Sequence, residues 1–277
     1  MASTTSGLEQ YYDAYERVEE AFQKALDESL HPRGPDYLYE LVAGFGLPKG
    51  SGVLDLGCGE GRHSMRLAEQ LGFAVTGVDP VSRHITLAKE ALADAVKQNP
   101  RLASRVRFAE GTAEAIPMND SSVELIWCKE ALYYFDLDRA FAECLRVLRS
   151  GGRMLIYNMF NGKRMEPREA ERQWTQDVVL TNADYTLVEA AMERSGLQIE
   201  ECIVLGGEGG EYSQEQSGEP GRRLLHAARL LREPERYIAR FGQANYDIML
   251  GDCFWHIYRM IGKLSARVYV LRAPTSA

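Results

Sequence analysis

Three glycines at alternate positions, Gly57, Gly59 and Gly61, follow an aliphatic stretch, and a second aliphatic stretch ends on the carboxylate of Asp79. Glycine has no Cβ, so a turn built from it lets a ligand lie directly against the backbone. An acidic side chain about 20 residues after such a turn is placed to accept hydrogen bonds from ribose hydroxyls at the crevice of an open α/β sheet. The pairing therefore predicts a binding site for a ligand that contains ribose.

The spacing and charge of this turn distinguish between ribose ligands. The dinucleotide fingerprint is G-x-G-x-x-G, whose helix N-terminus faces a pyrophosphate, whereas this chain has D-x-G-x-G-x-G from Asp55 and adds Glu60. Carboxylates repel a diphosphate and attract an ammonium group. The turn therefore favours S-adenosylmethionine (SAM), which carries an ammonium, a sulfonium and a ribose but no phosphate, over NAD.

Three further segments follow the turn in order: residues 107–117 (RFAEGTAEAIP), 122–130 (SVELIWCKE) and 145–156 (LRVLRSGGRMLI). Together with the turn they resemble the motifs of class I SAM-dependent methyltransferases, in the small-molecule branch around the ubiquinone/menaquinone-type and sarcosine-type enzymes (methyltransferase type 11-like). The resemblance covers residues 35–160. It implies a Rossmann-like fold, SAM as the cofactor and methyl transfer to a small-molecule acceptor.

The resemblance also implies which residues form the cofactor site. Residues 107–117 are similar to a G-D-A-E-x-L-P adenine loop; Thr112 stands where the family most often has Asp, so the adenine contact falls to the backbone of Thr112 and Ala113. In relatives, the end of the fourth strand touches cofactor and acceptor, and an N-terminal helix with tyrosines closes over the cofactor. The residues expected to bind SAM are Asp55, Gly57, Cys58, Gly59, Asp79, Pro80, Thr112, Ala113, Glu114, Lys129 and Tyr15.

Methyl transfer from a sulfonium is a direct displacement, so the protein has to hold the nucleophile, the methyl carbon and the leaving sulfur in line. A base is needed where the nucleophile carries a proton, or where methylation of an alkene leaves a carbocation. We expect Glu130, Tyr134 and His256 to act in catalysis, with C-, N- and O-methylation all open. A wider set of candidates for acceptor contact or proton removal comprises Tyr133, Tyr157, Asn158, Trp255, Tyr258, Glu169 and Glu171.

Each of these residues also has a purely structural interpretation. A histidine on an aromatic helix, such as His256, is more often a hydrogen-bonded core residue than a base, and Tyr133 and Tyr134 can simply pack the following helix. The aromatic residues near the expected mouth favour an apolar or aromatic acceptor of secondary metabolism, such as a prenyl, quinone-like or amine compound, or one that passes through a cation stabilised by π faces.

The composition limits the classes of partner and the cellular compartment that we expect for this protein. The 277-residue chain has a net charge of −8, which argues against nucleic acid and anionic membranes as partners. Its five cysteines form no C-x-x-C pair and no zinc spacing, so we expect reduced thiols and no metal. The N-terminus does not resemble a signal peptide, and no apolar run approaches the ~20 residues that span a bilayer. These features predict a cytoplasmic protein without stable membrane association.

The elements that position the motifs follow from the hydrophobic pattern. Five short aliphatic runs alternate with helical segments, which is typical of a doubly wound α/β sheet with parallel strands. Two later runs complete seven strands, so the predicted fold is a Rossmann-like, seven-stranded sheet with an N-terminal helical lid and a helical cap inserted before the last strand. The predicted strands are 52–56, 74–78, 105–108, 123–127, 153–158, 198–205 and 265–271.

The chain is accordingly divided into four parts. Residues 1–34 form a helical lid, 35–205 the SAM-binding core, 206–263 a connector with a helical acceptor cap, and 264–277 the final strand and tail. The polar, glycine-rich start of the third part, up to Gly221, predicts a flexible connector. The lid helix, expected at residues 8–30, carries an apolar stripe that packs on the body, closes over the cofactor, or exchanges between subunits of a homo-oligomer.

Other classes of function stay open beside the methyltransferase. A SAM-binding protein of this fold could act as a cyclase or another non-methylating catalyst on a bound metabolite. A non-catalytic partner subunit is disfavoured because the glycine-rich turn and Asp79 are intact. An RNA or protein methyltransferase is disfavoured because Lys129-Glu130-Ala131-Leu132 stands where an N-P-P-Y-type acceptor motif would follow the fourth strand.

Overall fold

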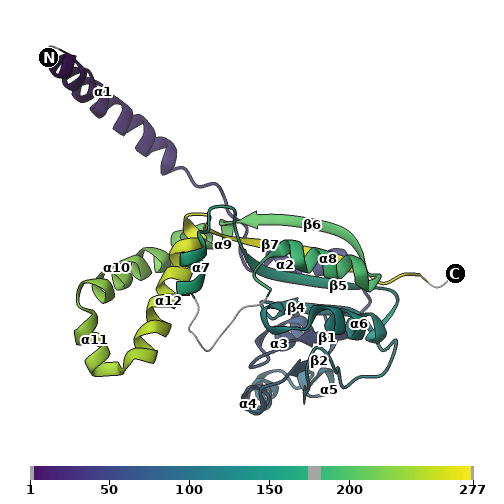
Figure 1. Ribbon diagram of the computed structural model, residues 1–277. Helices are drawn as coiled ribbons and strands as arrows, with labels where there is room; N and C mark the ends of the chain where they lie inside the picture. Colours follow the sequence, from purple (N-terminus) through teal and green to yellow (C-terminus); the bar gives the residue numbers. More distant parts are fainter. Residues whose placement is uncertain (1–2, 174–181, 276–277) are drawn as a thin grey trace. The chain divides into compact units, whose positions relative to one another are not determined.

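The protein is represented by a computed structural model that describes residues 3–173 and 182–275 and consists of two compact units, Met1–Arg33 and Gly34–Ala277. The first unit contains the helix α1 (Ser3–Leu26), labelled in Figure 1. Within this helix the rings of Tyr11 and Tyr15 lie 5.8 Å apart, as their helical spacing predicts. The role of residues 1–34 as a lid stays a prediction.

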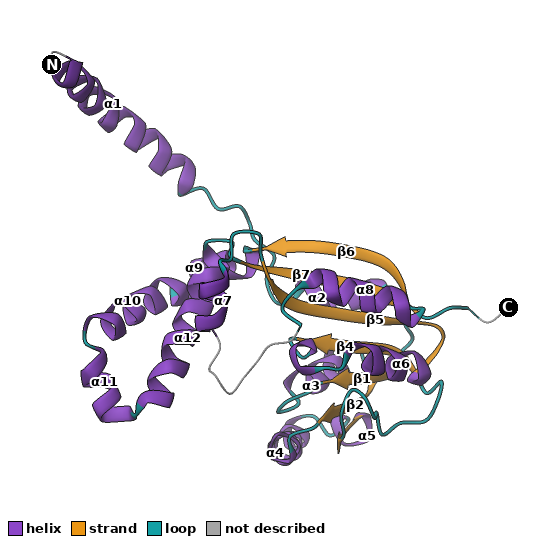
Figure 2. Ribbon diagram, in the orientation of Figure 1, coloured by secondary structure: helices purple, strands orange, loops and turns teal. Residues whose placement is uncertain are grey.

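The second unit is built on a seven-stranded sheet with the order β3-β2-β1-β4-β5-β7-β6 (Figure 2). The pairs among β1 to β5 are parallel, and β7 runs antiparallel to both β5 and β6. The Rossmann-like fold class is confirmed, and the last two strands make the sheet mixed. The strands are β1 (Gly52–Leu56), β2 (Ala74–Asp79), β3 (Val106–Glu110), β4 (Val123–Lys129), β5 (Leu148–Asn161), β6 (Gln198–Gly206) and β7 (Leu264–Arg272).

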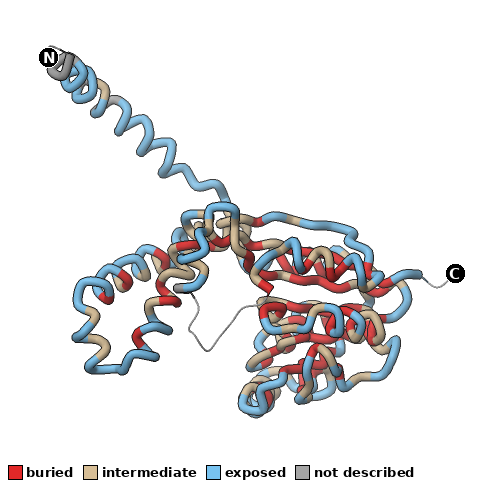
Figure 3. The backbone as a smooth tube through the Cα atoms, viewed as in Figure 1, coloured by how far each residue is buried: buried red, intermediate tan, exposed pale blue. Residues whose placement is uncertain are grey.

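Helices cover both faces of this sheet because successive strand residues point to opposite sides. Val53 packs in a cluster with residues of α2 and α3, while the next residue, Leu54, packs in a second cluster with residues of α6 and α8. Figure 3 shows these buried segments along the strands and the inner sides of the helices. The covering helices are α2 (Tyr37–Gly44), α3 (Arg62–Gln70), α4 (Ser82–Gln98) and α5 (Leu102–Arg105) on the first side, with α6 (Leu137–Val147) and α8 (Tyr185–Ser195) on the second.

The predicted helical cap before the last strand is present, but the predicted flexible connector is wrong. Residues 206–221 contain a helix, α9 (Glu208–Ser217), and the first residues of the next one. Glycine here permits close packing of helices: a Cβ on Gly207 would lie 2.7 Å from the carbonyl oxygen of Arg259. The other helices of this region are α10 (Glu219–Arg232), α11 (Pro234–Phe241) and α12 (Gln243–Met260). A helix from earlier in the chain, α7 (Pro167–Gln173), contacts α12.

Two details concern segments between these elements. The charged sequence from Asn161 to Asp177 predicts a loop and a short helix. The structure has the helix α7 there, and the part of the segment from residue 174 lies outside the described residues. A glycine after a helical segment predicts a helix end in the left-handed conformation, and Gly196 ends α8 in this way. Among the helices of the described chain, none combines the length and apolar character that a membrane span requires.

Candidate functional site

The glycine-rich turn after β1 has the backbone that only glycine adopts easily. Gly57, Gly59 and Gly61 have φ angles of 76°, 52° and 78°, all in the left-handed region. A Cβ on Gly57 would lie 2.4 Å from Cβ of Ala131, and one on Gly61 would lie 2.3 Å from Cζ of Phe108. A Cβ on Gly59 would meet no protein atom within 4 Å. The outer two glycines therefore permit packing, and the space above Gly59 is open to a ligand.

Asp79, at the end of β2, is tied to this turn. Its Oδ2 accepts a hydrogen bond from the backbone N–H of Gly59 at 2.9 Å, and its Oδ1 accepts one from the N–H of Val81 at 3.0 Å. His84 Nδ1 also lies 3.1 Å from Oδ1. The carboxylate is buried yet keeps unused lone pairs, which fits the predicted contact with ribose hydroxyls.

Asp55 lies on β1, the strand next to β2, and its side chain is beneath the start of α3. Its carboxylate accepts a hydrogen bond of 2.5 Å from the hydroxyl of Ser64 and is 2% exposed. Burial raises the pKa of this carboxyl to about 7. Next in the turn, Cys58 is buried as well, and burial raises the pKa of its thiol. The sulfur of Cys58 therefore stays a neutral packing group at neutral pH.

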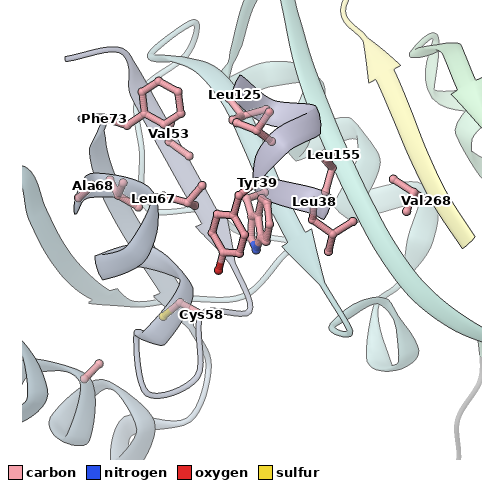
Figure 4. Close-up of a cluster of buried hydrophobic side chains, with 14 of the residues drawn as sticks. Leu38, Tyr39, Val53, Cys58, Leu67, Ala68, Phe73, Leu125, Leu155 and Val268 are labelled. Atoms are coloured by element: carbon pink, nitrogen blue, oxygen red, sulfur yellow. The ribbon is translucent and has the colours of Figure 1, made fainter. Parts of the chain in front are cut away.

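A cluster of aromatic side chains that the sequence did not reveal lies beside this turn. The hydroxyl of Tyr39, on α2, lies 2.5 Å from Nδ1 of His63, on α3. Both rings pack against Trp127 of β4, with centroid distances of 4.9 and 5.7 Å. In Figure 4 the Tyr39 hydroxyl is directed towards the end of β1, where Cys58 follows. Burial lowers the pKa of His63 to about 4, so its imidazole is neutral at neutral pH.

Two of the predicted site residues, Lys129 and Glu130, lie at the end of β4. The ammonium of Lys129 forms an ion pair of 2.6 Å with Glu130 and lies 5.2 Å from the ring centroid of Tyr157 on β5. Glu130 has a φ of 55°, an unusual value for a residue other than glycine. Such local strain is typical of functional positions. The three side chains come together, at the same edge of the sheet as the glycine-rich turn.

The two neighbouring tyrosines after β4 differ in their surroundings. Tyr133 is buried, and its hydroxyl accepts a hydrogen bond from the backbone N–H of Met159 at 3.1 Å. Tyr134, which we selected as catalytic, is 63% exposed. Asn158 is fully buried on the opposite face of β5 from Tyr157, because side chains alternate along a strand. The contacts of Tyr134 and Asn158 with an acceptor stay predictions, and Tyr133 has a structural partner.

The predicted adenine loop follows β3, and Pro80 follows β2, so both lie at the carboxyl ends of their strands. Thr112 pairs with Ala115 in a short bridge and is exposed, and Ala113 is buried. The carboxylate of Glu114 accepts a hydrogen bond of 2.9 Å from the N–H of Asp136, which ties the loop to the start of α6. Pro80 is exposed directly after Asp79. The carbonyl of Thr112 accepts a hydrogen bond from the N–H of Ala115 at 3.3 Å, and the adenine contact through the backbone of Thr112 and Ala113 stays a prediction.

The remaining candidates lie on α12 of the cap or on α7, which contacts α12. His256 lies 3.9 Å from the carboxylate of Asp252, and burial lowers the pKa of its imidazole. The ring of Tyr258 stacks on Phe254 with a centroid distance of 5.5 Å. Glu169 of α7 forms an ion pair with Lys263, which lowers the pKa of its carboxyl. Of the other two, Trp255 is half-buried beside Arg259 and Glu171 is exposed.

Two cavities of the second unit lie away from the glycine-rich turn. One of about 290 Å³ is lined by the first residues of β1 to β4, at the amino edge of the sheet. The other, of about 430 Å³, is an apolar groove among α10, α11 and α12. Ligands of open α/β sheets bind at the carboxyl ends of the strands, so we place the candidate site at the turn and not in either cavity.

Comparison with known proteins finds likenesses that include the segment with the glycine-rich turn. A family model described as a methyltransferase domain matches residues 54–156. An uncharacterized methyltransferase of Mycobacterium tuberculosis is 38% identical over 107 residues, 38% of this chain and 39% of that protein. The 2-methyl-6-phytyl-1,4-hydroquinone methyltransferase of Synechocystis is 35% identical over 111 residues, 40% of this chain and 32% of that protein. The chain thus spans about two fifths of the length of the curated relatives it matches.

The solved structures extend the likeness to the whole fold. The [4+2]-cyclase SpnF superposes with a TM-score of 0.66 at 20% identity, covering 87% of this chain and 82% of that one. The match over residues 54–156 and these likenesses confirm the resemblance to class I SAM-dependent methyltransferases.

Proposed function

We propose that this protein is an enzyme that transfers the methyl group of SAM to a small-molecule acceptor. SAM supplies an electrophilic methyl group on its sulfonium and leaves as S-adenosylhomocysteine. The protein's own residues hold the cofactor, orient the acceptor and exclude water from the reacting atoms. The proposal concerns both the matched domain at residues 54–156 and the described cap helices.

One observation carries this proposal: the open space above Gly59, whose N–H donates to Asp79. The turn presents backbone without side chains, and Asp79 presents carboxylate lone pairs at the adjacent strand end. Asp55 adds a carboxyl beneath the turn in place of the phosphate-binding groups of a dinucleotide site. These residues suit a ligand with a ribose and a cationic amino-acid part, which is the chemistry of SAM.

The acceptor end of the proposed site combines polar and aromatic groups. Lys129, Glu130 and Tyr157 supply charge and a hydroxyl, and Trp255 and Tyr258 supply aromatic faces. This mixture supports an apolar or aromatic acceptor that carries a polar nucleophile, such as a quinone-like, prenyl or amine metabolite. Glu130, Tyr134 and His256 are the proposed catalytic residues, with Glu130 placed next to the proposed cofactor site. The hydroquinone methyltransferase among the relatives has an acceptor of this kind in its name.

Calorimetric titration of the purified full chain with SAM and, separately, with NAD tests the cofactor assignment. We expect micromolar binding of SAM and no binding of NAD. Mass spectrometry of reactions with phenols, hydroquinones, prenyl compounds and amines then tests for a mass gain of one methylene unit with release of S-adenosylhomocysteine. Binding of NAD alone would contradict the proposal.

A non-methylating SAM-binding catalyst is the alternative, and the [4+2]-cyclase among the solved structures shows that this fold occurs in a cyclase. It would bind SAM and convert a metabolite without producing S-adenosylhomocysteine. We favour the methyltransferase because Glu130 and Tyr157 are positioned at the strand end next to the proposed cofactor site. A cytoplasmic location, a homo-oligomer and cofactor contact by Tyr15 stay predictions.

A further inference from the structure

Arg259, near the end of α12, has its guanidinium held by stacking. The Cζ atom lies 4.4 Å from the ring centroid of Trp255, one turn earlier on the same helix. The residue is half-buried, and no carboxylate of the described residues lies within ion-pair distance of it. A cation that is partly removed from water and is not paired is costly unless an anion joins it.

The glycine-rich segment before and within α9 makes room for this side chain. A Cβ on Gly209 would lie 2.5 Å from an Nη atom of Arg259, and a Cβ on Gly207 would lie 2.7 Å from its carbonyl oxygen. A larger residue at position 209 would displace the guanidinium. The glycines that the sequence presents as a flexible connector instead allow α9 to lie against the arginine.

The hydroxyl of Tyr157 also lies near Gly209. A Cβ on Gly209, which would lie 2.5 Å from the guanidinium, would lie 4.0 Å from this hydroxyl, so the hydroxyl and the guanidinium both border the space beside Gly209. The ring of Tyr157 is in turn 5.2 Å from the ammonium of Lys129, which pairs with Glu130. Tyr157 therefore connects the end of β4 to Arg259.

The two cations near Tyr157, Lys129 and Arg259, differ in their described close contacts. The ammonium of Lys129 is neutralised by Glu130 at 2.6 Å, whereas Arg259 has the Trp255 ring as its described close contact. Arginine presents a planar fork of N–H groups that matches a carboxylate or a phosphate, and stacking on a ring leaves the edge of that fork free to bind. The hydroxyl of Tyr157 donates a weak hydrogen bond to the sulfur of Met159 at 3.8 Å, and its O–H can turn to a stronger acceptor that binds beside the guanidinium.

We propose that Arg259, together with the Tyr157 hydroxyl, selects an acceptor that carries an anionic group, a carboxylate or a phosphate. The inference rests on the proposed function, since it concerns the acceptor end of the same site. Arg259 is a specificity-determining residue: it holds the anionic end of the acceptor, so that the opposite end lies towards Lys129 and Glu130.

Paired probes that differ only in the anionic group test this inference. Calorimetry in the presence of S-adenosylhomocysteine compares 4-hydroxybenzoate with 4-hydroxybenzamide, and geranyl phosphate with geraniol. For the wild-type protein we expect the anionic member of at least one pair to bind about tenfold tighter or more, and the pair that shows it distinguishes a carboxylate from a phosphate. In Arg259→Gln that preference disappears, while Arg259→Lys retains part of it.

Arg240→Gln is the matched control, because Arg240 is an exposed cap arginine that also stacks on a ring, that of Phe241, at 4.9 Å. It should keep the wild-type preference. Equal binding of charged and neutral probes to the wild type, binding of none of them, or an unchanged preference in Arg259→Gln would overturn the inference. Binding of S-adenosylhomocysteine is measured separately, and its absence would contradict the proposed function instead.

Discussion

The backbone N–H of Gly59 donates a hydrogen bond to the carboxylate of Asp79 at 2.9 Å. Two features that lie twenty residues apart in the sequence, a glycine-rich turn and the acid that ends the next strand, are therefore joined directly. Parallel pairing of β1 with β2 brings their carboxyl ends together, and Gly57 and Cys58 donate to the carbonyl of Val78 just before Asp79. The proposed cofactor site is thus held by backbone hydrogen bonds from both strand ends.

Gly59→Ala is expected to weaken SAM binding strongly while the protein stays folded. The new Cβ meets no protein atom within 4 Å, so it intrudes only on the space that a ligand would occupy. The left-handed φ of 52° costs about 1–2 kcal/mol of stability for a residue with a Cβ. We expect a loss of affinity of about tenfold or more in calorimetry, with a cooperative thermal transition retained.

Gly61→Ala is the matched comparison, since it has a similar φ of 78° but a different neighbour. Its Cβ would lie 2.3 Å from the Phe108 ring, so overpacking adds about 1–3 kcal/mol to the backbone strain. We expect its thermal transition to fall further than that of Gly59→Ala. Normal SAM affinity in Gly59→Ala would show that no ligand occupies the space above that glycine.

Asp79→Ala is expected to weaken SAM binding by about 1–3 kcal/mol, because a buried acceptor of ribose hydroxyls is removed. The variant also leaves the N–H groups of Gly59 and Val81 without this acceptor, so affinity alone does not identify the cause. Calorimetry with S-adenosylhomocysteine and its 2′-deoxy analogue separates the two effects. If Asp79 binds the ribose, the substitution costs less for the 2′-deoxy analogue; equal losses for both would remove the ribose assignment.

The positions of the strands along the chain and the glycine-rich turn could be predicted from the sequence because both depend on local patterns. Aliphatic runs, glycine spacing and a terminal acid lie within short stretches of chain. The contact between Tyr39 and His63 could not be predicted, because it joins two helices whose residues carry no shared motif. Neither a tyrosine on an amphipathic helix nor a histidine after a glycine-rich turn indicates this contact by itself.

The glycines at 206–210 were misinterpreted for a related reason. Glycine marks either a flexible segment or a close approach of two backbones, and local sequence does not distinguish these. Only the position of Arg259 shows that Gly207 and Gly209 serve packing. The same limit applies to Tyr133 and Tyr134: the sequence places both after β4, and the hydrogen bond from Met159 identifies which one is buried.

Glu130→Gln is expected to leave SAM affinity within about twofold of wild type while lowering the rate of methyl transfer. The substitution keeps the shape of the side chain and removes the charge that pairs with Lys129 at 2.6 Å. The proposed role of Glu130 lies on the acceptor side, so the turnover number should change and the calorimetric affinity for SAM should not. A parallel loss of SAM affinity would move Glu130 into the cofactor site.

Asp94→Asn provides the control for this measurement. Asp94 also forms a 2.6 Å ion pair with a lysine, Lys97, but on the exposed surface of α4. Exposed pairs contribute little to stability. Wild-type binding and turnover in this variant would show that the effect of Glu130→Gln depends on its position and not on the loss of one negative charge.

The last prediction concerns Asp55 and His63, whose protonation acts on stability in opposite directions. Burial raises the pKa of Asp55 from its ordinary value of 3.8 to about 7, so between these pH values the folded protein binds the extra proton and the free energy of unfolding falls as pH rises. Burial lowers the pKa of His63 from 6.5 to about 4, so the unfolded chain binds the extra proton and the free energy of unfolding rises with pH.

The two contributions overlap between about pH 4 and 6.5 and oppose each other there. Asp55→Asn leaves the contribution of His63, so its free energy of unfolding should rise with pH relative to wild type, by up to about 1.4 kcal/mol per pH unit. His63→Gln leaves that of Asp55, so its free energy of unfolding should fall with pH relative to wild type. Urea denaturation at about pH 5 and pH 6.5 measures both slopes, and the double variant should again resemble wild type. Parallel slopes in wild type and both single variants would mean that neither group titrates as its burial requires.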